Sequence, residues 1–349
     1  MLTGWYPTFR LNRPLEPEER QQHLAYKAAQ PVVPDDELGM IRFNSTFLEF
    51  VNRTFKVKGM AATLVSGVAA IGFVLFNVIL AIVSYGRYAA GGYTLNEYVL
   101  ATAFLIVLTS GLAYFFWRIH LRNDLFAYTY YPVRFNRKTR QVHFFVHEGA
   151  GGTVTVPWGD ASVFFHIGRG SQNKELRDLR CHVLKDEQVT QTFTVGHYWW
   201  HENRVRGEWE LIRRYMEEGP ENAFDHSQDR VITLSPQGAW LNCYMWVCHA
   251  LGTDLYKFRF LLFPIYGLLT LSRWLTFKSC REPVWPPEVE AGCAIDPDSV
   301  SPAGADVHGR VRPGRRQVPA CGRTASTAAK LEVAGAEQAP VMGLCEVRS

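Results

Sequence analysis

Two long stretches without a charged residue dominate the pattern of apolar and polar positions along the chain. They cover residues 60–86 and 98–117. As helices they would be about 40 Å and about 30 Å long, and about 20 apolar residues suffice to cross the hydrocarbon core of a bilayer. A buried helix of a soluble protein usually keeps one polar face, which neither stretch has. The pattern therefore predicts a transmembrane hairpin within residues 59–118, and its first helix begins too late to be a cleaved signal peptide.

The cations that flank the two stretches predict the orientation of the hairpin. The first stretch is preceded by Arg53, Lys56 and Lys58. The second is followed by further cations, namely Arg118, Arg122, Arg134, Arg137, Lys138 and Arg140. The connection at 87–97 carries only Arg87 and Glu97 as charged residues. Because cytoplasmic loops carry the excess of Lys and Arg, we expect both ends of the hairpin in the cytoplasm and its connection in the periplasm of a Gram-negative cell.

Small residues recur every four positions along the first stretch, at Ala62, Ser66 and Ala70. Small side chains at this spacing let two membrane helices approach closely. We expect this edge to pack against the second stretch of the same chain, with self-association of the hairpin as the alternative. Asn77 is the most polar residue of the first stretch, and the absence of an ionisable group argues against a functional site inside the membrane.

From residue 125 the pattern changes to short aromatic and β-branched runs separated by polar turns. Six strands are predicted, at 127–135, 141–146, 153–156, 162–167, 180–184 and 189–195. The turns at 136–140 and 185–188 indicate two hairpins, and strands without intervening helices are typical of an antiparallel barrel or sandwich. The preceding residues 1–58 are polar and contain several prolines, so we expect a separate N-terminal cytoplasmic segment. Within it, residues 40–53 fit either a strand or a short amphipathic helix.

An amphipathic helix is predicted after the strands. Val205, Trp209, Ile212 and Met216 form one apolar stripe at helical spacing, and Gly219-Pro220 ends the pattern. The fold class that follows is an α+β membrane protein. In it, a two-helix transmembrane hairpin precedes a small antiparallel β-barrel or sandwich, which the amphipathic helix closes. In such a fold Trp209 is buried against the strands.

The remaining C-terminal part divides into an aromatic segment at 221–292 and a tail at 293–349. The segment contains an uncharged run at 260–272 that reaches only about 20 Å as a helix, which is short of a membrane span. We expect it to contact the membrane surface, with a core helix and a third span as alternatives. The tail contains no Phe, Trp or Tyr. It is predicted to be disordered, or to be coding sequence that is not authentic.

Composition and charge exclude some classes of protein. The chain of 349 residues is 47% hydrophobic and 20% charged, which excludes a wholly disordered protein. The net charge of +4 is too small to indicate a nucleic-acid partner. Seven scattered cysteines fit a reduced compartment better than a disulfide framework.

Motifs for catalysis, metals or cofactors are not recognisable in the sequence. His197 and His201 are followed by Glu202, but the order differs from the H-E-x-x-H of metalloproteases. Cys243, Cys248 and His249 lack a second pair of ligands at zinc spacing. Neither a nucleophile elbow nor a phosphate-binding glycine loop occurs. We therefore expect no catalytic residues, metal site or cofactor.

The order of strands and a long amphipathic helix that contains Trp209 resembles the pleckstrin-homology-like domains that bacterial membrane proteins carry beside paired transmembrane helices. The resemblance covers residues 125–220 and implies a lipid headgroup site at the first hairpin turn. Its residues would be Arg134, Arg137, Lys138 and Arg140. The alternative is that these cations only set the topology and solvate a turn.

The whole chain also resembles an uncharacterised family of proteobacterial inner-membrane proteins that is associated with type VI secretion gene clusters. The resemblance rests on the paired spans and on RFNRKTRQVHFF at 134–145, VPWGD at 156–160 and REPVWPPEVEAGC at 281–293. It implies a non-enzymatic interaction or accessory protein with a role in immunity or assembly. Its partners would be membrane lipid and another membrane protein or secreted effector. The main alternative is a lipid- or partner-sensing signalling module. An enzyme without a known motif and a channel of associated hairpins are more distant alternatives.

Overall fold

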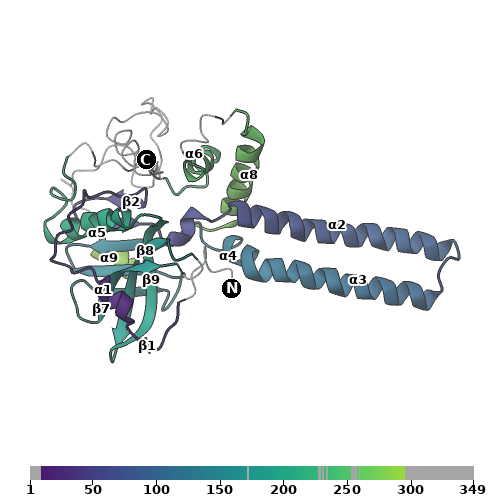
Figure 1. The fold of residues 1–349 in the computed structure, drawn as a ribbon, viewed down its shortest axis with the longest axis horizontal. Coiled ribbons are helices and arrows are strands. Elements are labelled where there is room, and N and C mark those ends of the chain that lie inside the picture. Colours follow the sequence, from purple (N-terminus) through teal and green to yellow (C-terminus); the bar gives the residue numbers. More distant parts are fainter. Residues whose placement is uncertain are drawn as a thin grey trace, which may run out of the picture.

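A pair of long helices projects from a mixed α+β domain in the computed structural model of the chain (Figure 1). The structure describes residues 9–294 except for short gaps, at 171–172, 227–228, 230–231, 233–234, 253–257 and 259. The predicted disordered tail lies outside the described residues, apart from its first two positions.

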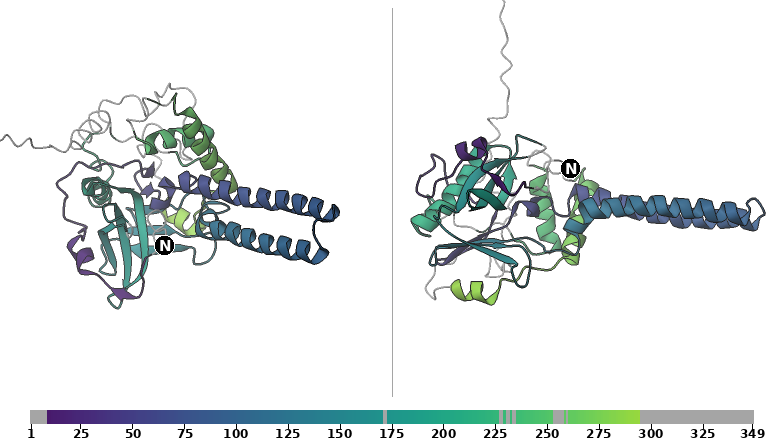
Figure 2. Two further views of the ribbon diagram at one scale, coloured as in Figure 1. Left: turned by 45° about the vertical axis from the view of Figure 1, so that its right-hand side comes forward. Right: turned by 90° about the horizontal axis from the view of Figure 1, so that it is seen from below.

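The two apolar stretches form the helices α2 (Ala61–Ala89) and α3 (Leu95–Phe116). They run side by side in Figure 1 and in the left-hand view of Figure 2, and they contact each other along the hairpin. Both are long and apolar enough to cross a membrane, and only 6% of either apolar window is buried within the protein. A π-turn, η2 (Trp117–Leu121), and a short helix, α4 (Arg122–Asp124), return the chain to the domain. The structure thus confirms two helices at the predicted positions.

Both ends of this hairpin connect to strands of one five-stranded antiparallel sheet. Its strands, in spatial order, are β2 (Met40–Phe43), β3 (Phe47–Phe50), β4 (Val133–Asn136), β5 (Gln141–Phe145) and β6 (Thr153–Pro157). The neighbours β3 and β4 pair antiparallel, with Phe47 opposite Asn136 and Phe50 opposite Val133. The hairpin of α2 and α3 is therefore an insertion between two adjacent strands of one sheet.

The second sheet has four antiparallel strands. In spatial order they are β1 (Arg13–Pro14), β9 (Gln188–Trp199), β8 (Arg177–Lys185) and β7 (Val163–Arg169). The six predicted strands are all present. Among the described strands, no pairing joins the two sheets, so the predicted barrel is not seen to close.

The N-terminal residues are part of the domain rather than the separate segment that we expected. The stretch at 40–53 supplies β2 and β3, and β1 extends the other sheet. This correction has a physical reason: β1 and β3 pair with strands that lie more than 80 residues away, such as Asn136 of β4 for Phe47 of β3, and β2 pairs with β3. The domain also extends beyond the expected limits of 125–220 at its C-terminal end.

The helix α5 (Glu202–Glu217) covers the sheets and carries the predicted stripe. Val205, Trp209 and Ile212 are fully buried in the main core. The Trp209 ring lies 5.0 Å from that of Phe165 and 5.5 Å from that of Trp158, measured between ring centroids. The expected burial of Trp209 against the strands is confirmed.

Four further short elements belong to the domain. They are α1 (Pro17–Gln21), the 3-10 turn η1 (Arg53–Lys56), α6 (Trp240–Ala250) and α9 (Pro287–Gly292). A longer helix, α8 (Phe263–Ser279), packs against α6 and beside the start of α2. In Figure 1 it runs across the direction of the hairpin rather than along it.

Candidate functional site

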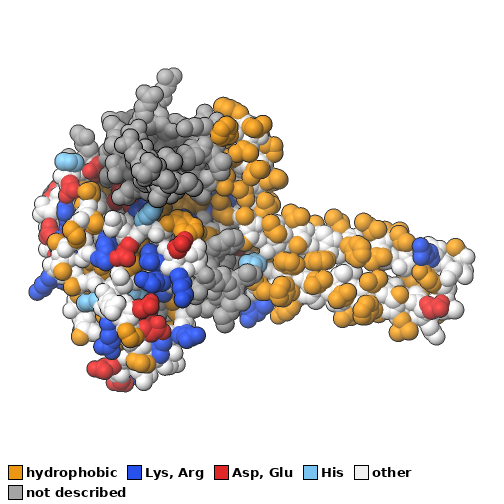
Figure 3. Space-filling view, viewed as in Figure 1, with side chains coloured by type: hydrophobic (Ala, Val, Ile, Leu, Met, Phe, Trp, Pro, Cys, Tyr) orange, Lys and Arg blue, Asp and Glu red, His pale blue; other side chains and the backbone are white. Residues whose placement is uncertain are grey.

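The most extensive candidate site is the apolar surface of the hairpin. Exposed side chains occur around both helices, including Val68 at 63%, Ile82 at 67% and Val107 at 72% exposure. Figure 3 shows apolar side chains over the visible face of the hairpin, whereas the visible face of the domain mixes them with charges. Such a surface is far larger than the apolar patches that monomeric soluble proteins expose. Its chemistry fits lipid chains.

Helix α8 continues this apolar surface onto the domain (Figure 3). Ile265, Leu268 and Leu275 are each about half exposed, and they fall on one face at helical spacing. The opposite face buries Tyr266 and Leu269 against α6. The helix is thus apolar on both sides, which a helix on the surface of a soluble domain usually is not.

Hydrogen bonds of the Asp124 and Arg273 side chains, together called the polar lock, hold the base of the hairpin in place. The Asp124 side chain, at the end of α4, accepts hydrogen bonds from the Gly59 backbone N–H at 2.9 Å and from the Thr63 hydroxyl. Arg273 of α8 is 1% exposed and donates to the carbonyl oxygens of Phe55 and Lys58, at 3.1 Å and 2.6 Å. The start of α2, the end of α4 and α8 are therefore fixed to one another.

Gly59 is required at the centre of this lock. Its φ of +72° is a left-handed conformation, and a Cβ atom there would lie 2.6 Å from the Cα atom of Arg273. Beside it, Lys58 is 2% exposed and donates to the Asn123 carbonyl oxygen at 3.4 Å. Burial lowers the pKa of the Lys58 ammonium group to about 8. By contrast, Arg118 and Arg122 are exposed at the end of the hairpin.

The predicted packing edge of the first helix is only partly buried. Ser66 is 3% exposed, whereas Ala62 and Ala70 are half-buried. The helices also meet through a polar contact, in which the Thr109 hydroxyl lies 2.7 Å from the Asn77 side-chain oxygen. Contacts between α2 and α3 within one chain are thus present. Self-association of the hairpin stays a prediction.

Arg134 is placed where no headgroup can reach it, which corrects its assignment to a lipid site. Its side chain is fully buried. It donates to Glu49 at 2.7 Å and to Glu290 at 3.1 Å, and its guanidinium lies 4.2 Å from the centre of the Phe47 ring. Because side chains alternate along the strand, Arg134 lies on the face opposite to the core residues Val133 and Phe135. There α9 covers it, and two carboxylates from distant parts of the chain neutralise it.

The other three cations of the predicted site lie in or beside the turn from β4 to β5. Arg137 is half-buried next to Gly219, and Lys138 and Arg140 are exposed. Arg140 donates to the Met216 carbonyl oxygen at 2.8 Å and to the Glu217 carboxylate at 2.7 Å. This turn is therefore attached to the C-terminal end of α5.

The opposite end of α5 lies near the start of the hairpin. Arg204 in its first turn stacks over Trp199, and Lys56 from η1 lies 3.9 Å from the centre of the same ring. The 16 residues of α5 span about 24 Å, which is well beyond a Debye length of about 8 Å. The turn is thus at the end of α5 away from the hairpin, and its position does not favour contact with headgroups.

The sequence motifs that suggested a family contact one another in the domain. Asn136 donates to the Gly292 carbonyl oxygen at 2.7 Å, and Trp285 lies 4.8 Å from the guanidinium of Arg134. The Trp158 indole donates to Glu217 at 2.6 Å. These motifs therefore tie α9 and α5 to the sheets, which is a structural role.

A cavity of about 260 Å³ opens between the sheets, at the stacked rings of Phe144 and Phe193. Its lining consists of aromatic and aliphatic side chains with Thr and Asn; its only ionisable member is Tyr131. The lining thus supplies no pair of groups for acid–base catalysis.

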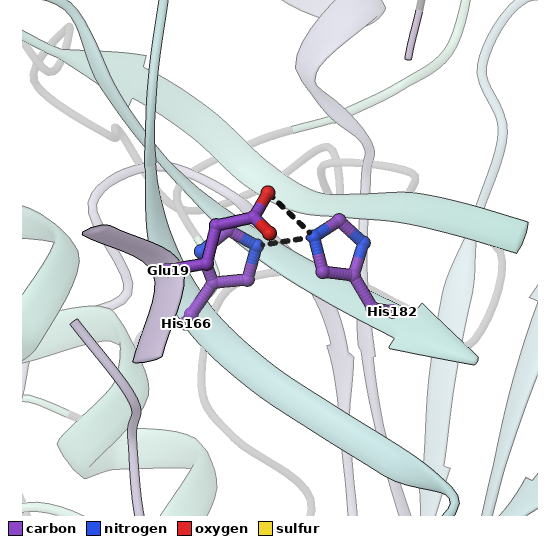
Figure 4. Close-up of side chains that lie close together, drawn as sticks. All are labelled: Glu19, His166 and His182. Atoms are coloured by element: carbon purple, nitrogen blue, oxygen red, sulfur yellow. Dashed lines mark hydrogen bonds and ion pairs between the residues drawn. The ribbon is translucent and has the colours of Figure 1, made fainter. Parts of the chain in front are cut away.

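A buried polar cluster lies elsewhere in the domain, on Glu19, His166 and His182 (Figure 4). Among the described residues, it is the one group of His, Cys, Asp or Glu side chains whose atoms are close enough to share a metal ion. Burial, aided by the neighbouring His182 and Arg180, lowers the pKa of His166 to about 3. Burial acts against the charge of Glu19, but hydrogen bonds from Arg13 and His182 hold the pKa of this carboxyl well below its usual range.

This cluster was missed by the sequence analysis, which considered His197 and His201 instead. His197 is buried, and its Nε2 atom lies 3.1 Å from the Leu38 carbonyl oxygen, while His201 is exposed. Glu19 precedes His166 by nearly half of the chain, so spacing carries no signal. Only the pairing of β7 with β8 brings the two histidines together.

These features define an α+β protein that carries two helices long and apolar enough to cross a membrane. Residues 110–297 match DUF6708, a family of unknown function. The match covers more than half of the 349 residues, and the chain belongs to this family. No curated protein and no solved structure matches the chain. The matched region runs from within α3 past α9, whereas β1–β3 and α2 precede it.

Proposed function

We propose that this protein is a non-enzymatic interaction or accessory protein of the bacterial inner membrane. In this proposal the hairpin of α2 and α3 crosses the bilayer, and the α+β domain is held against the cytoplasmic surface. The observation that carries it is the apolar surface that continues from the hairpin onto α8 (Figure 3). Exposure of this surface to water would cost about 25 cal/mol per Å², a cost that lipid chains remove.

The ends of the hairpin support a transmembrane placement. Trp117 and Phe126 are exposed near its base, and Tyr85 and Tyr93 are exposed near its tip. Aromatic side chains of this kind are enriched at the two interfaces of a membrane. Arg118 and Arg122 are exposed at the base, whereas the connection at 87–97 carries Arg87 as its one cation, and this difference favours a cytoplasmic domain.

Helix α8 would then lie in the interface of the same leaflet. Its exposed stripe faces away from α6, and the helix runs across the hairpin direction (Figure 1). The lock through Arg273 keeps it at the base of α2. An in-plane helix of this kind buries its apolar face at the boundary between headgroups and acyl chains.

We place the protein in a type VI secretion setting, in a role of immunity or assembly, on the family resemblance described above. The test is a survey of neighbouring genes followed by co-expression with the neighbouring secreted effector. Protection of the host cell by the intact chain would support immunity. A chromosomal neighbourhood without secretion genes, or no protection, would remove this part of the proposal.

A sensing role is the second candidate, and one observation favours it. The hairpin is inserted between the paired strands β3 and β4, and Asp124 fastens its two ends together. A partner that shifts α2 against α3 would therefore act directly on one sheet of the domain. The same arrangement serves a passive anchor, which makes the interaction role the simpler proposal.

The placement of α8 is tested by fluorescence in liposomes. A Leu268→Cys variant carries an environment-sensitive fluorophore, in a chain whose Cys280, Cys321 and Cys345 are replaced by Ser. Because Leu268 lies on the exposed stripe, we expect a blue-shifted emission and quenching by nitroxide-labelled lipids. A matched Lys185→Cys variant, at the exposed end of β8, should show neither effect. Equal, weak quenching at both sites would contradict the in-plane helix.

A further inference from the structure

The cluster of Glu19, His166 and His182 comes from three separate elements that meet on one face of the four-stranded sheet. His166 of β7 and His182 of β8 are diagonal neighbours, because Phe164 is the direct partner of His182. The core side chain Phe165 points to the opposite face. Glu19 belongs to α1, which covers this outer face beside β7.

The three side chains direct their ligand atoms at one point (Figure 4). The two Nε2 atoms of the histidines lie 2.8 Å apart, and the Nε2 atom of His182 lies 3.1 Å from Glu19 Oε1. All three ligand atoms fall within 4.8 Å of one another. His166 and His182 are each 1% exposed and Glu19 is 9% exposed, so bulk water does not account for the arrangement.

Hydrogen bonding alone leaves this arrangement incompletely satisfied. Only one hydrogen can lie between the two Nε2 atoms, and the single N–H that His182 would place there faces two acceptors at once. A metal ion would instead use one lone pair from each of the three ligand atoms. Tetrahedral zinc, with ligands at about 2.0–2.1 Å, needs ligand atoms about 3.3 Å apart. The two Nε2 atoms, 2.8 Å apart, would therefore have to separate by roughly half an ångström to bind it.

The surroundings hold the ligands as the second shell of a metal site does. Thr192 Oγ1 lies 2.7 Å from Nδ1 of His182, a contact that leaves Nε2 of this ring for the metal. Arg13 donates to both carboxylate oxygens of Glu19, at 2.8 Å and 2.6 Å, and the Glu16 backbone N–H donates to Oε2 at 2.9 Å. The carboxylate is thereby fixed with one lone pair of Oε1 directed at the histidines.

We propose that Glu19, His166 and His182 form a binding site for one divalent transition-metal ion. Two imidazoles and one carboxylate are the ligand types that suit zinc and its neighbours, and they leave at least one position for water. The site joins α1 to β7 and β8, so the bound ion would fasten the N-terminal segment to the sheet. This inference is independent of the proposed function at the membrane.

The test uses the full chain in detergent, stripped with a chelator and then titrated with Zn²⁺. We expect one equivalent of zinc to remain after gel filtration, as measured by elemental analysis. Each of the variants His166→Gln and His182→Gln should weaken binding at least about tenfold, as loss of even a second-shell partner does. With Co²⁺ in place of zinc, the wild type should show the visible absorption that is typical of cobalt in a site with few ligands. Both variants should lack this absorption.

The matched control is His143→Gln. His143 is also buried, and its Nδ1 atom lies 2.8 Å from a threonine hydroxyl, that of Thr155, but it is not part of the cluster. This variant should bind zinc like the wild type. Thermal unfolding of each metal-free variant shows whether it is folded, and Glu19→Gln provides a third ligand test. A wild type that retains no zinc, or unchanged zinc and cobalt binding in the variants of His166 and His182, would overturn the proposal.

Discussion

At the scale of single residues, Glu208 is a buried carboxyl whose surroundings do not favour its charged form. The side chain is fully buried, and neither carboxylate oxygen has a hydrogen-bond partner among the described residues. Burial, followed by the negative charges of Glu37, Asp36 and Asp35, raises the pKa of Glu208 well above its ordinary value of 4.5. The folded domain therefore holds this residue as the neutral acid.

A pH dependence follows from this burial. Because the pKa is higher in the folded state, Glu208 takes up a proton on folding once the pH exceeds about 4.3. The free energy of unfolding should then fall as pH rises toward the folded-state pKa, by at most about 1.4 kcal/mol per pH unit from this group. Glu208→Gln should be more stable than the wild type at neutral pH, and the difference should vanish in acid.

Urea unfolding in detergent, followed by tryptophan fluorescence between pH 4 and pH 8 (roughly the range over which a shifted Glu titrates), measures this effect. Glu187→Gln, in the exposed turn before β9, controls for the loss of a carboxylate. A Glu208→Gln profile parallel to that of the wild type would show that the group does not change its protonation on folding.

Residue patterns also explain which parts of the candidate sites were predictable. The alternation around Arg134 was visible in the sequence, but its two carboxylate partners, Glu49 and Glu290, lie 85 and 156 residues away. A basic turn and a buried ion pair therefore look alike before the fold is known. The cluster of Glu19, His166 and His182 could not be predicted for the same reason, because Glu19 lies 163 residues from His182.

At the scale of elements, local periodicity carried the successful predictions. The two apolar helices, the six strands from β4 to β9 and the stripe of α5 each have a repeat that is complete within one segment. The N-terminal strands β2 and β3 do not show this clearly, since both are short and nearly continuous in apolar residues. Their assignment depends on β4, which follows the whole membrane hairpin.

Helix α5 contributes most through Trp209, which stacks among the rings of Tyr26, Trp158 and Phe165. Trp209→Ala should lower the free energy of unfolding by about 3–5 kcal/mol, because it removes a fully buried ring and leaves a cavity. Trp200→Ala is the matched control, since that ring is 57% exposed just before α5. Chemical denaturation of both variants gives the comparison, and equal losses of stability would contradict the packing of α5.

At the scale of the whole molecule, the domain is discontinuous in sequence and the hairpin is its insertion. The chain leaves the sheet after β3, forms the two apolar helices and returns to pair β4 beside β3. Composition and hydropathy predicted the hairpin and the α+β domain, but they placed the N-terminal residues outside the domain. The barrel or sandwich was expected from the spacing of the strands, and a closed barrel is not seen among the described strands. The headgroup turn was an expectation from a resemblance, and the positions of Arg134 and of the turn do not support it.

The central claim is that α2 and α3 cross the membrane and leave the domain in the cytoplasm. Labelling of single cysteines by a membrane-impermeant maleimide in intact spheroplasts tests it most directly, with Ala90→Cys in the hairpin connection and Lys185→Cys in the domain. Both positions are exposed, so accessibility depends only on the side of the membrane. We expect the Ala90→Cys variant to be labelled in intact spheroplasts and the Lys185→Cys variant to be labelled only after lysis. Labelling at position 185 before lysis, or protection at position 90, would contradict it.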